Sequence, residues 1–143
     1  MPVTAPEITR RAWLIALAAP LLADTRQDIL DLFTAMASAL SEGNGLVFLD
    51  HVDHSMPNYQ KLEQNVLALV AQNEILSSLD VLKQDGTDEE QDVELDWFLQ
   101  IRSREENGPL ERRRQSVKCR LMRTKKKWKV TSLEPVSFFV PPA

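Results

Sequence analysis

The sequence predicts an α+β protein in which three helices are followed by an antiparallel sheet. Two stretches, Asp92 to Arg102 and Gln115 to Arg123, alternate between apolar and polar residues, which indicates strands with one buried face. Upstream, apolar residues recur at helical spacing from Thr25 to Leu40 and from Pro57 to Asn73. Helices grouped before the strands, rather than alternating with them, are typical of the α+β class.

The longer alternating stretch organises the predicted sheet. Its apolar face carries Val93, Leu95, Trp97, Leu99 and Ile101. A hairpin centred near Gly108 would place Trp97 opposite Cys119 and Asp96 opposite Arg120. We therefore expect a hairpin with one apolar and one charged face, whose apolar face the rest of the chain covers.

Two helices are expected before residue 53. Thr25 and Asp28 form an opening similar to a capping box, and Gly43 is expected as the C-cap of the first helix. The apolar positions of this helix are Ile29, Leu32, Phe33, Met36 and Leu40. A short second helix is expected from Gly45 to Val52. The residues that it should turn inward are Leu46, Leu49 and Val52.

The remaining elements follow from proline and turn signals. Pro57 is expected at the first position of a third helix that ends near Asn73. Its apolar stripe consists of Tyr59, Leu62, Val66, Leu69 and Val70. Residues 84–87 are expected to form a turn. Besides the two alternating stretches, the predicted strands are Ile75 to Leu82, Trp128 to Leu133 and a short last one from Val136 to Val140.

The charge pattern indicates a solvated face of ion pairs. The formal net charge is −4, so the chain has no general attraction to nucleic acid or to an anionic membrane. About half of the acids lie in residues 80–111, and more than half of the bases lie in residues 112–129. In a hairpin many of these bases face acids on the neighbouring strand and are largely neutralised, which argues against the alternative of a nucleic-acid patch at Arg112 to Arg114. The lysine turn, Lys125 to Lys127, stays exposed and is interpreted as serving solubility.

The first 23 residues resemble a cleaved signal peptide. Arg10 and Arg11 precede an uncharged apolar run, Ala12 to Ala23, which is too short to span a bilayer. Thr9 to Leu14 is similar to the twin-arginine export motif, and the choice between that route and Sec export stays open. The alternative is an amphipathic helix packed on the domain, against which the all-round apolarity and Pro20 argue. The chain is thus divided into a signal peptide, 1–23, and one domain, 24–143.

Three features carry a resemblance to a known superfamily. They are the helix that ends in Ser41-Glu-Gly-Asn-Gly45, the short helix from Leu46 to Asp53, and the closing Trp128-Lys-Val-Thr-Ser-Leu133. Together their order resembles the nuclear transport factor 2-like superfamily, also called SnoaL-like, among the cystatin-like α+β cones. The resemblance covers about residues 24–140. It implies three helices packed on the concave face of a curved antiparallel sheet of four to five strands. Many members insert a strand pair where this chain has only Asp53 to Pro57.

The resemblance implies a pocket between the concave sheet face and the helices. Some members are enzymes, such as ketosteroid isomerase and polyketide cyclases, and many bind ligands or partners. An isomerase of that kind needs an inward carboxylate and an oxyanion-stabilising Tyr or protonated Asp. The predicted inward strand positions carry no acid, so no catalytic residue carries over. The single cysteine excludes an internal disulfide and a cysteine-cluster zinc site. We expect no cofactor and no metal.

A binding pocket, if open, would use a defined set of residues. The pocket candidates are Phe33, Tyr59, Leu95, Trp97, Leu99 and Cys119, and the polar residues at its mouth are His51 and His54. Asp50-His51 and Asp53-His54 are interpreted as capping the third helix, with metal binding or acid–base chemistry as the alternative. Trp97 is either the floor of the pocket or a plain core residue.

The sequence thus favours an exported, non-enzymatic module that binds a small apolar ligand or a protein. The expected protein partner is a second copy that pairs through the outer sheet face, with no nucleic acid and no membrane contact beyond the signal peptide. The alternative is a cavity enzyme, such as an isomerase, cyclase or dehydratase, for a small hydrophobic substrate. A buried carboxylate or histidine with a partner would favour the enzyme.

Overall fold

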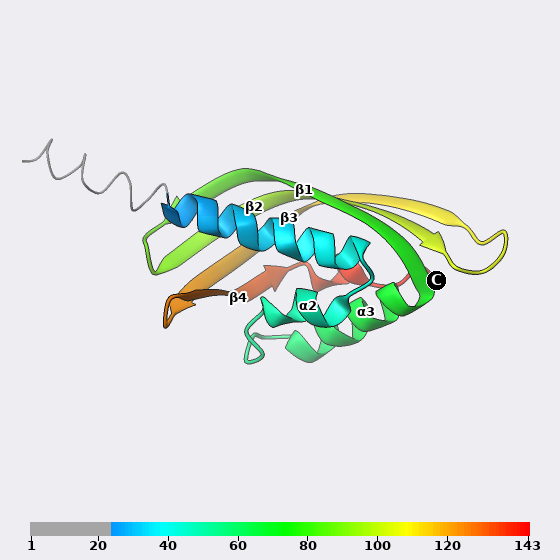
Figure 1. The fold of residues 1–143 in the computed structure, drawn as a ribbon, viewed down its shortest axis with the longest axis horizontal. Coiled ribbons are helices and arrows are strands. Elements are labelled where there is room, and N and C mark those ends of the chain that lie inside the picture. The colour runs from blue at the N-terminus through cyan, green and yellow to red at the C-terminus, as the bar shows by residue number, and fades with distance from the viewer. Residues whose placement is uncertain (1–23) are drawn as a thin grey trace, which may run out of the picture.

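The computed structural model describes residues 24–143, and the predicted signal peptide lies outside them (Figure 1). A helix over residues 24–41 comes first. The elements that follow are α2 (Gly45–Asp50), α3 (Tyr59–Gln72), β1 (Asn73–Gly86), β2 (Glu90–Ser103), β3 (Leu110–Thr124), β4 (Lys127–Glu134) and the 3-10 helix η1 (Val136–Phe139). The predicted α+β class is confirmed, with three helices before a curved, four-stranded antiparallel sheet.

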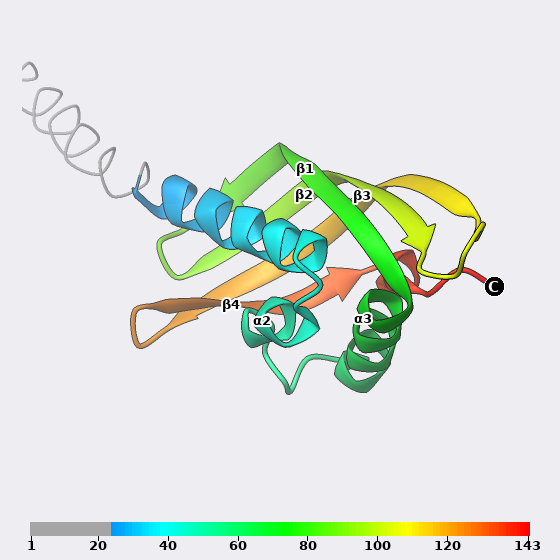
Figure 2. The ribbon, with the colours of Figure 1, turned by 45° about the vertical axis from the view of Figure 1, so that its right-hand side comes forward.

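The sheet has the strand order β1-β2-β3-β4, so every neighbouring pair is a simple antiparallel connection. Figures 1 and 2 show the helices on one side of the sheet, while the β2–β3 hairpin extends beyond them. A parallel bridge between Val52 and Val130 joins the segment after α2 to β4. Within residues 24–143, no helix is long and apolar enough to cross a membrane.

The predicted hairpin register is wrong by four residues. Trp97 lies opposite Gln115 rather than Cys119, and Asp96 lies opposite Ser116 rather than Arg120. The tight turn is centred before Gly108, whose N–H donates to the carbonyl of residue 105. Because four is an even number, the shift leaves every side chain on its predicted face.

The helix boundaries also differ from the predicted ones. Residue 24 is already helical, and the Thr25 hydroxyl donates to Asp88 at 2.9 Å, so Thr25 ties the helix to the β1–β2 turn instead of capping it. Gly43 has a φ of +72°, as the predicted C-cap requires. Helix α3 begins at Tyr59, after a left-handed Asn58, and not at Pro57.

Three packing predictions need correction. Leu46 is 67 % exposed, and Phe48 fills the inward position of α2 instead. Strand β1 continues through Gly86, so the turn begins at residue 87 and not at 84. The last predicted strand is the 3-10 helix η1. Phe138 and Phe139 are both buried, which neighbouring residues of a half-exposed strand cannot be, because successive side chains point to opposite faces.

Candidate functional site

The side of Trp97 that faces the helices is filled by other aromatic rings. Trp97 is fully buried, with the Phe139 ring edge-on at 5.2 Å between centroids and the Phe48 ring at 6.2 Å. Phe138 completes this aromatic cluster at 6.5 Å. The indole N–H donates to the Ser77 hydroxyl at 2.8 Å, so the one polar atom of the ring is satisfied within the protein.

The other predicted pocket residues of the sheet and first helix share this core. Phe33, Leu95 and Leu99 expose no surface, and Cys119 exposes 4 %. A cavity that admits even one water molecule leaves accessible surface on its walls. Burial also raises the pKa of the Cys119 thiol, so it stays protonated. Ligand binding at these residues stays a prediction that requires core side chains to separate.

The predicted mouth residues lie on the connection between α2 and α3. The backbone carbonyl of His51 accepts a hydrogen bond from the N–H of Val130 at 2.9 Å. Burial, with a smaller contribution from Lys129, lowers the pKa of this half-buried histidine, which favours the neutral ring. The ring of His54 lies 4.5 Å from that of Tyr59, beside a separate surface hollow.

The polar groups of this connection are occupied in local structure. The Asp53 carboxylate accepts from both the backbone N–H and the hydroxyl of Ser55, and these bonds lower its pKa. Within residues 24–143, no group of three or more His, Cys, Asp or Glu side chains is arranged to hold a metal ion. The arrangement therefore favours a structural turn that joins the helices to β4.

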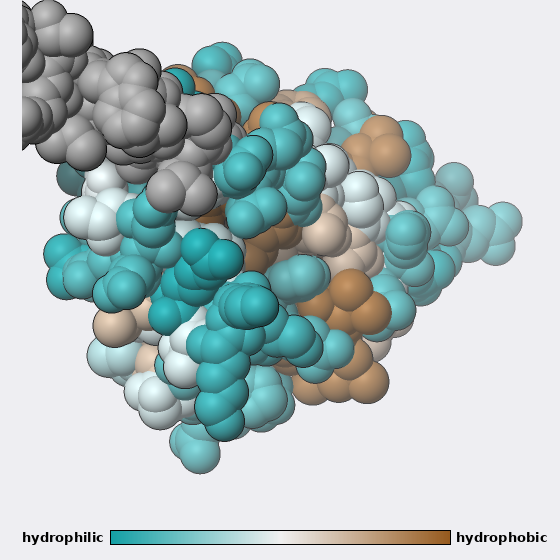
Figure 3. Space-filling view, turned by 60° about the vertical axis from the view of Figure 1, so that its left-hand side comes forward, coloured by the Kyte–Doolittle hydropathy of each residue, from teal (hydrophilic) through white to brown (hydrophobic). Residues whose placement is uncertain are grey.

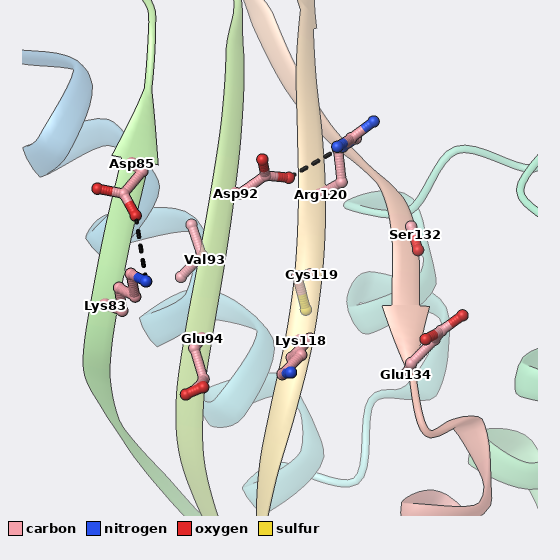
Figure 4. Close-up of a pocket in the computed structure, with 10 residues that line it drawn as sticks. All are labelled: Lys83, Asp85, Asp92, Val93, Glu94, Lys118, Cys119, Arg120, Ser132 and Glu134. Atoms are coloured by element: carbon pink, nitrogen blue, oxygen red, sulfur yellow. Dashed lines mark hydrogen bonds and ion pairs between the residues drawn. The ribbon is translucent and has the colours of Figure 1, made fainter.

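The outer face of the sheet carries a hollow of about 530 Å³ that spans all four strands (Figure 4). Its lining residues are Lys83, Asp85, Asp92, Val93, Glu94, Lys118, Cys119, Arg120, Ser132 and Glu134. Figure 4 shows the helices behind the sheet, so this hollow lies on the opposite side of the sheet from the helices. Two of its lining residues, Val93 and the predicted pocket residue Cys119, are nearly buried and also belong to the core. The sequence reasoning named its charged residues only as a solvated face. The sequence signal that could have found this site is the set of polar residues that alternate with the apolar ones in β2 and β3.

Charge pairs dominate the outer face, as predicted. Asp92 receives a hydrogen bond from Arg120 at 2.9 Å, and Asp96 receives one from Arg114 at 2.6 Å. Arg114 lowers the pKa of the Asp96 carboxyl through this hydrogen bond and its charge. Because acids and bases are matched across strands, the face suits a partner that itself carries both signs of charge.

Comparisons with known proteins confirm the predicted fold. No family model and no curated protein matches the chain. Several solved structures share its fold. One is a nuclear transport factor 2-like superfamily protein from Salmonella enterica serovar Typhimurium, with 10 % identity and a TM-score of 0.65, covering 78 % of this chain and 89 % of that one.

Two more structures extend the comparison. A hexachlorocyclohexane dehydrochlorinase (LinA) type 2 has 12 % identity and a TM-score of 0.64, with 80 % of this chain and 86 % of that chain covered. A protein of unknown function with a cystatin-like fold from Nostoc punctiforme has 16 % identity and a TM-score of 0.53, with 76 % and 86 % covered. At these identities the likeness concerns the fold, which serves enzymes and binding modules alike. The chain has the nuclear transport factor 2-like, cystatin-like α+β fold.

Proposed function

We propose that the chain is an exported, non-enzymatic protein-binding module whose partner is a second copy of itself. The observation that carries this proposal is the filled interior. Trp97, Leu95 and Leu99 expose no surface at the centre of the concave face, where an enzyme of this fold would need room for its substrate. Within residues 90–124, strands β2 and β3 carry no fully buried carboxylate and no fully buried histidine on that face.

The outer face has the chemistry of a protein interface. Phe98 lies half-buried at its centre, between Ser78 on β1 and Arg114 on β3. Leu76 is 59 % exposed on the neighbouring edge of the same face. Aromatic and arginine side chains are enriched at the anchoring positions of interfaces. In a two-fold dimer the same face of each copy forms the interface. A face that carries both signs of charge can pair with itself in this way, because acids of one copy can lie opposite bases of the other.

The oligomeric state tests this proposal directly. Sedimentation equilibrium of the full chain should give a dimer, and Phe98→Glu should give a monomer, because the new charge would be buried at the centre of the interface. Leu46→Glu is the matched control, since it makes the same kind of change at a residue that is 67 % exposed on α2. It should leave the dimer intact. A monomeric wild type, or equal effects of the two changes, would contradict the proposal.

A fluorescence titration separates the proposal from cavity binding. Emission from Trp97 should stay unchanged on addition of small apolar compounds, because its ring is enclosed by Phe48, Phe138 and Phe139. A saturable change that disappears in Trp97→Phe would favour an apolar ligand pocket instead.

Export is proposed from the signal-like pattern of residues 1–23. Mass spectrometry of the protein from its native cell should find an N-terminus near Asp24. A mature protein that retains Met1 would rule out cleavage.

A further inference from the structure

Four charged residues of alternating sign form one row across the outer face of the sheet. Lys83, Glu94, Lys118 and Glu134 lie on β1, β2, β3 and β4, and each is the register partner of the next. All four line the hollow (Figure 4). Lys83 lies 3.9 Å from Asp85, and the other three take part in no ion pair within 4.0 Å among residues 24–143. The row is therefore left largely available to charges outside the chain.

The charges next to this row on β2 and β3 are held within the chain. Arg120 binds Asp92 at 2.9 Å on one side of the row, and Arg114 binds Asp96 at 2.6 Å on the other. Exposed charge is common on this molecule, and Figure 3 shows a mainly hydrophilic surface at the end where the β1–β2 and β3–β4 turns lie. The row differs from such surface because its charges are open, alternate in sign and stand in register.

The order of signs along the row decides how two copies can meet. Two sheets that pack face to face in a dimer are related by a two-fold axis that lies between them. An axis across the strands would place each strand opposite its own copy, so that every charge of the row would face a like charge. An axis along the strands, between β2 and β3, reverses the row. An even row of alternating sign then places every charge opposite one of the other sign.

We propose that the two copies pair about an axis along the strands, so that Glu94 of each copy binds Lys118 of the other. This inference rests on the proposed dimer and specifies its arrangement. The same rotation places Lys83 of each copy opposite Glu134 of the other, at the two ends of the row. It also carries Phe98 onto its register partner Arg114, where a ring and a guanidinium group attract each other.

Charge reversal at two positions of the row tests the pairing by sedimentation equilibrium of the full chain. Glu94→Lys and Lys118→Glu should each raise the dimer dissociation constant at least about 100-fold, because each puts two like-charged contacts into the symmetric interface. An equimolar mixture of the two variants should dimerise nearly as the wild type does, since every contact between unlike variants again joins an acid to a base. Recovery on mixing also shows that both variants are folded.

Glu42→Lys and Lys61→Glu are the matched controls, since they reverse exposed charges outside the sheet. Each should dimerise as the wild type does. If the wild type and Phe98→Glu behave as proposed above but the mixture stays monomeric, the pairing is overturned and the proposed function stands. Equal effects of the row variants and the controls would also overturn the pairing. A monomeric wild type would remove the pairing and the proposed function together.

Discussion

The two faces of the β2–β3 hairpin are built from alternate residues of the same strands, yet they have opposite character. Leu95, Trp97 and Leu99 expose nothing, whereas Asp92, Glu94 and Asp96 reach solvent on the other face, where Asp92 and Asp96 also pair with arginines. The concave face is a sealed core, and the outer face is an open, charged surface with a hollow. The same alternation of residues thus produces a closed interior and an open exterior on one pair of strands.

The largest loss of stability should come from replacing one apolar residue of the concave face with a charged one. Leu95→Asp should lower the free energy of unfolding by more than about 4 kcal/mol and leave little folded protein, because the carboxylate would be buried without a partner. Its neighbour supplies the control, since Glu94→Gln changes an outer residue and should be nearly neutral. Urea unfolding followed by circular dichroism measures both, and similar losses would mean that the two faces are wrongly assigned.

The reactivity of Cys119 reports whether the concave face is sealed in solution. The thiol is buried, and burial raises its pKa, so both access and the thiolate fraction are low. Alkylation by iodoacetamide at neutral pH should be at least about 100-fold slower in the native protein than in urea. Comparable rates would show that the core opens readily, which would favour the hypothesis of a binding cavity between the sheet and the helices.

The two tryptophans of the domain are both buried, but only one of them has a hydrogen-bond partner for its indole N–H. The Trp97 N–H donates to Ser77, whereas the buried Trp128 N–H has no partner among residues 24–143. Trp97→Phe should cost about 2–3 kcal/mol, from a lost hydrogen bond and a new void, and Trp128→Phe about 1 kcal/mol or less, because no bond is lost. Denaturant midpoints measure the difference. A larger cost at Trp128 would contradict this account.

The sequence was sufficient for what depends on periodicity. The buried faces of β2 and β3, the first helix and its Gly43 C-cap all followed from spacing and residue type. Periodicity of two cannot distinguish registers that differ by an even number of residues, so Trp97 was placed opposite the wrong partner. The 3-10 turn of η1 was missed because two adjacent phenylalanines are equally compatible with a strand.

The candidate site was predictable only in part, and for a related reason. The sequence indicates which residues point inward, but whether they enclose a pocket depends on how Phe48 and Phe139 pack against Trp97 from distant parts of the chain. The outer hollow depends on the curvature of four strands, which no local pattern encodes. The positive φ values of Lys125 and Lys126 could not be predicted from the sequence either, because lysine is not typical of a type I′ turn.

The smallest effect should come from the outer face, and its pH dependence identifies the cause. Hydrogen bonding and charge from Arg114 lower the pKa of Asp96 in the folded protein below its ordinary value of 3.8. A carboxyl whose pKa is lower when folded stabilises the native state above its unfolded pKa, and this contribution is lost as pH falls through the folded pKa. Asp96→Asn should therefore be slightly less stable than the wild type at pH 7, and the difference should disappear once the pH is below the lowered pKa of Asp96 in the folded protein.

The same difference should shrink at high salt, because both side chains of the pair reach solvent and exposed ion pairs are screened. Thermal unfolding of the two proteins at pH 7, at acid pH and with added sodium chloride measures it. Glu74→Gln is a suitable control, since Glu74 is exposed on the same face and lies opposite Arg102 without an ion pair within 4.0 Å in the described part of the chain. A difference that persists at acid pH would have to come from packing beneath Arg114 and not from the charge of Asp96.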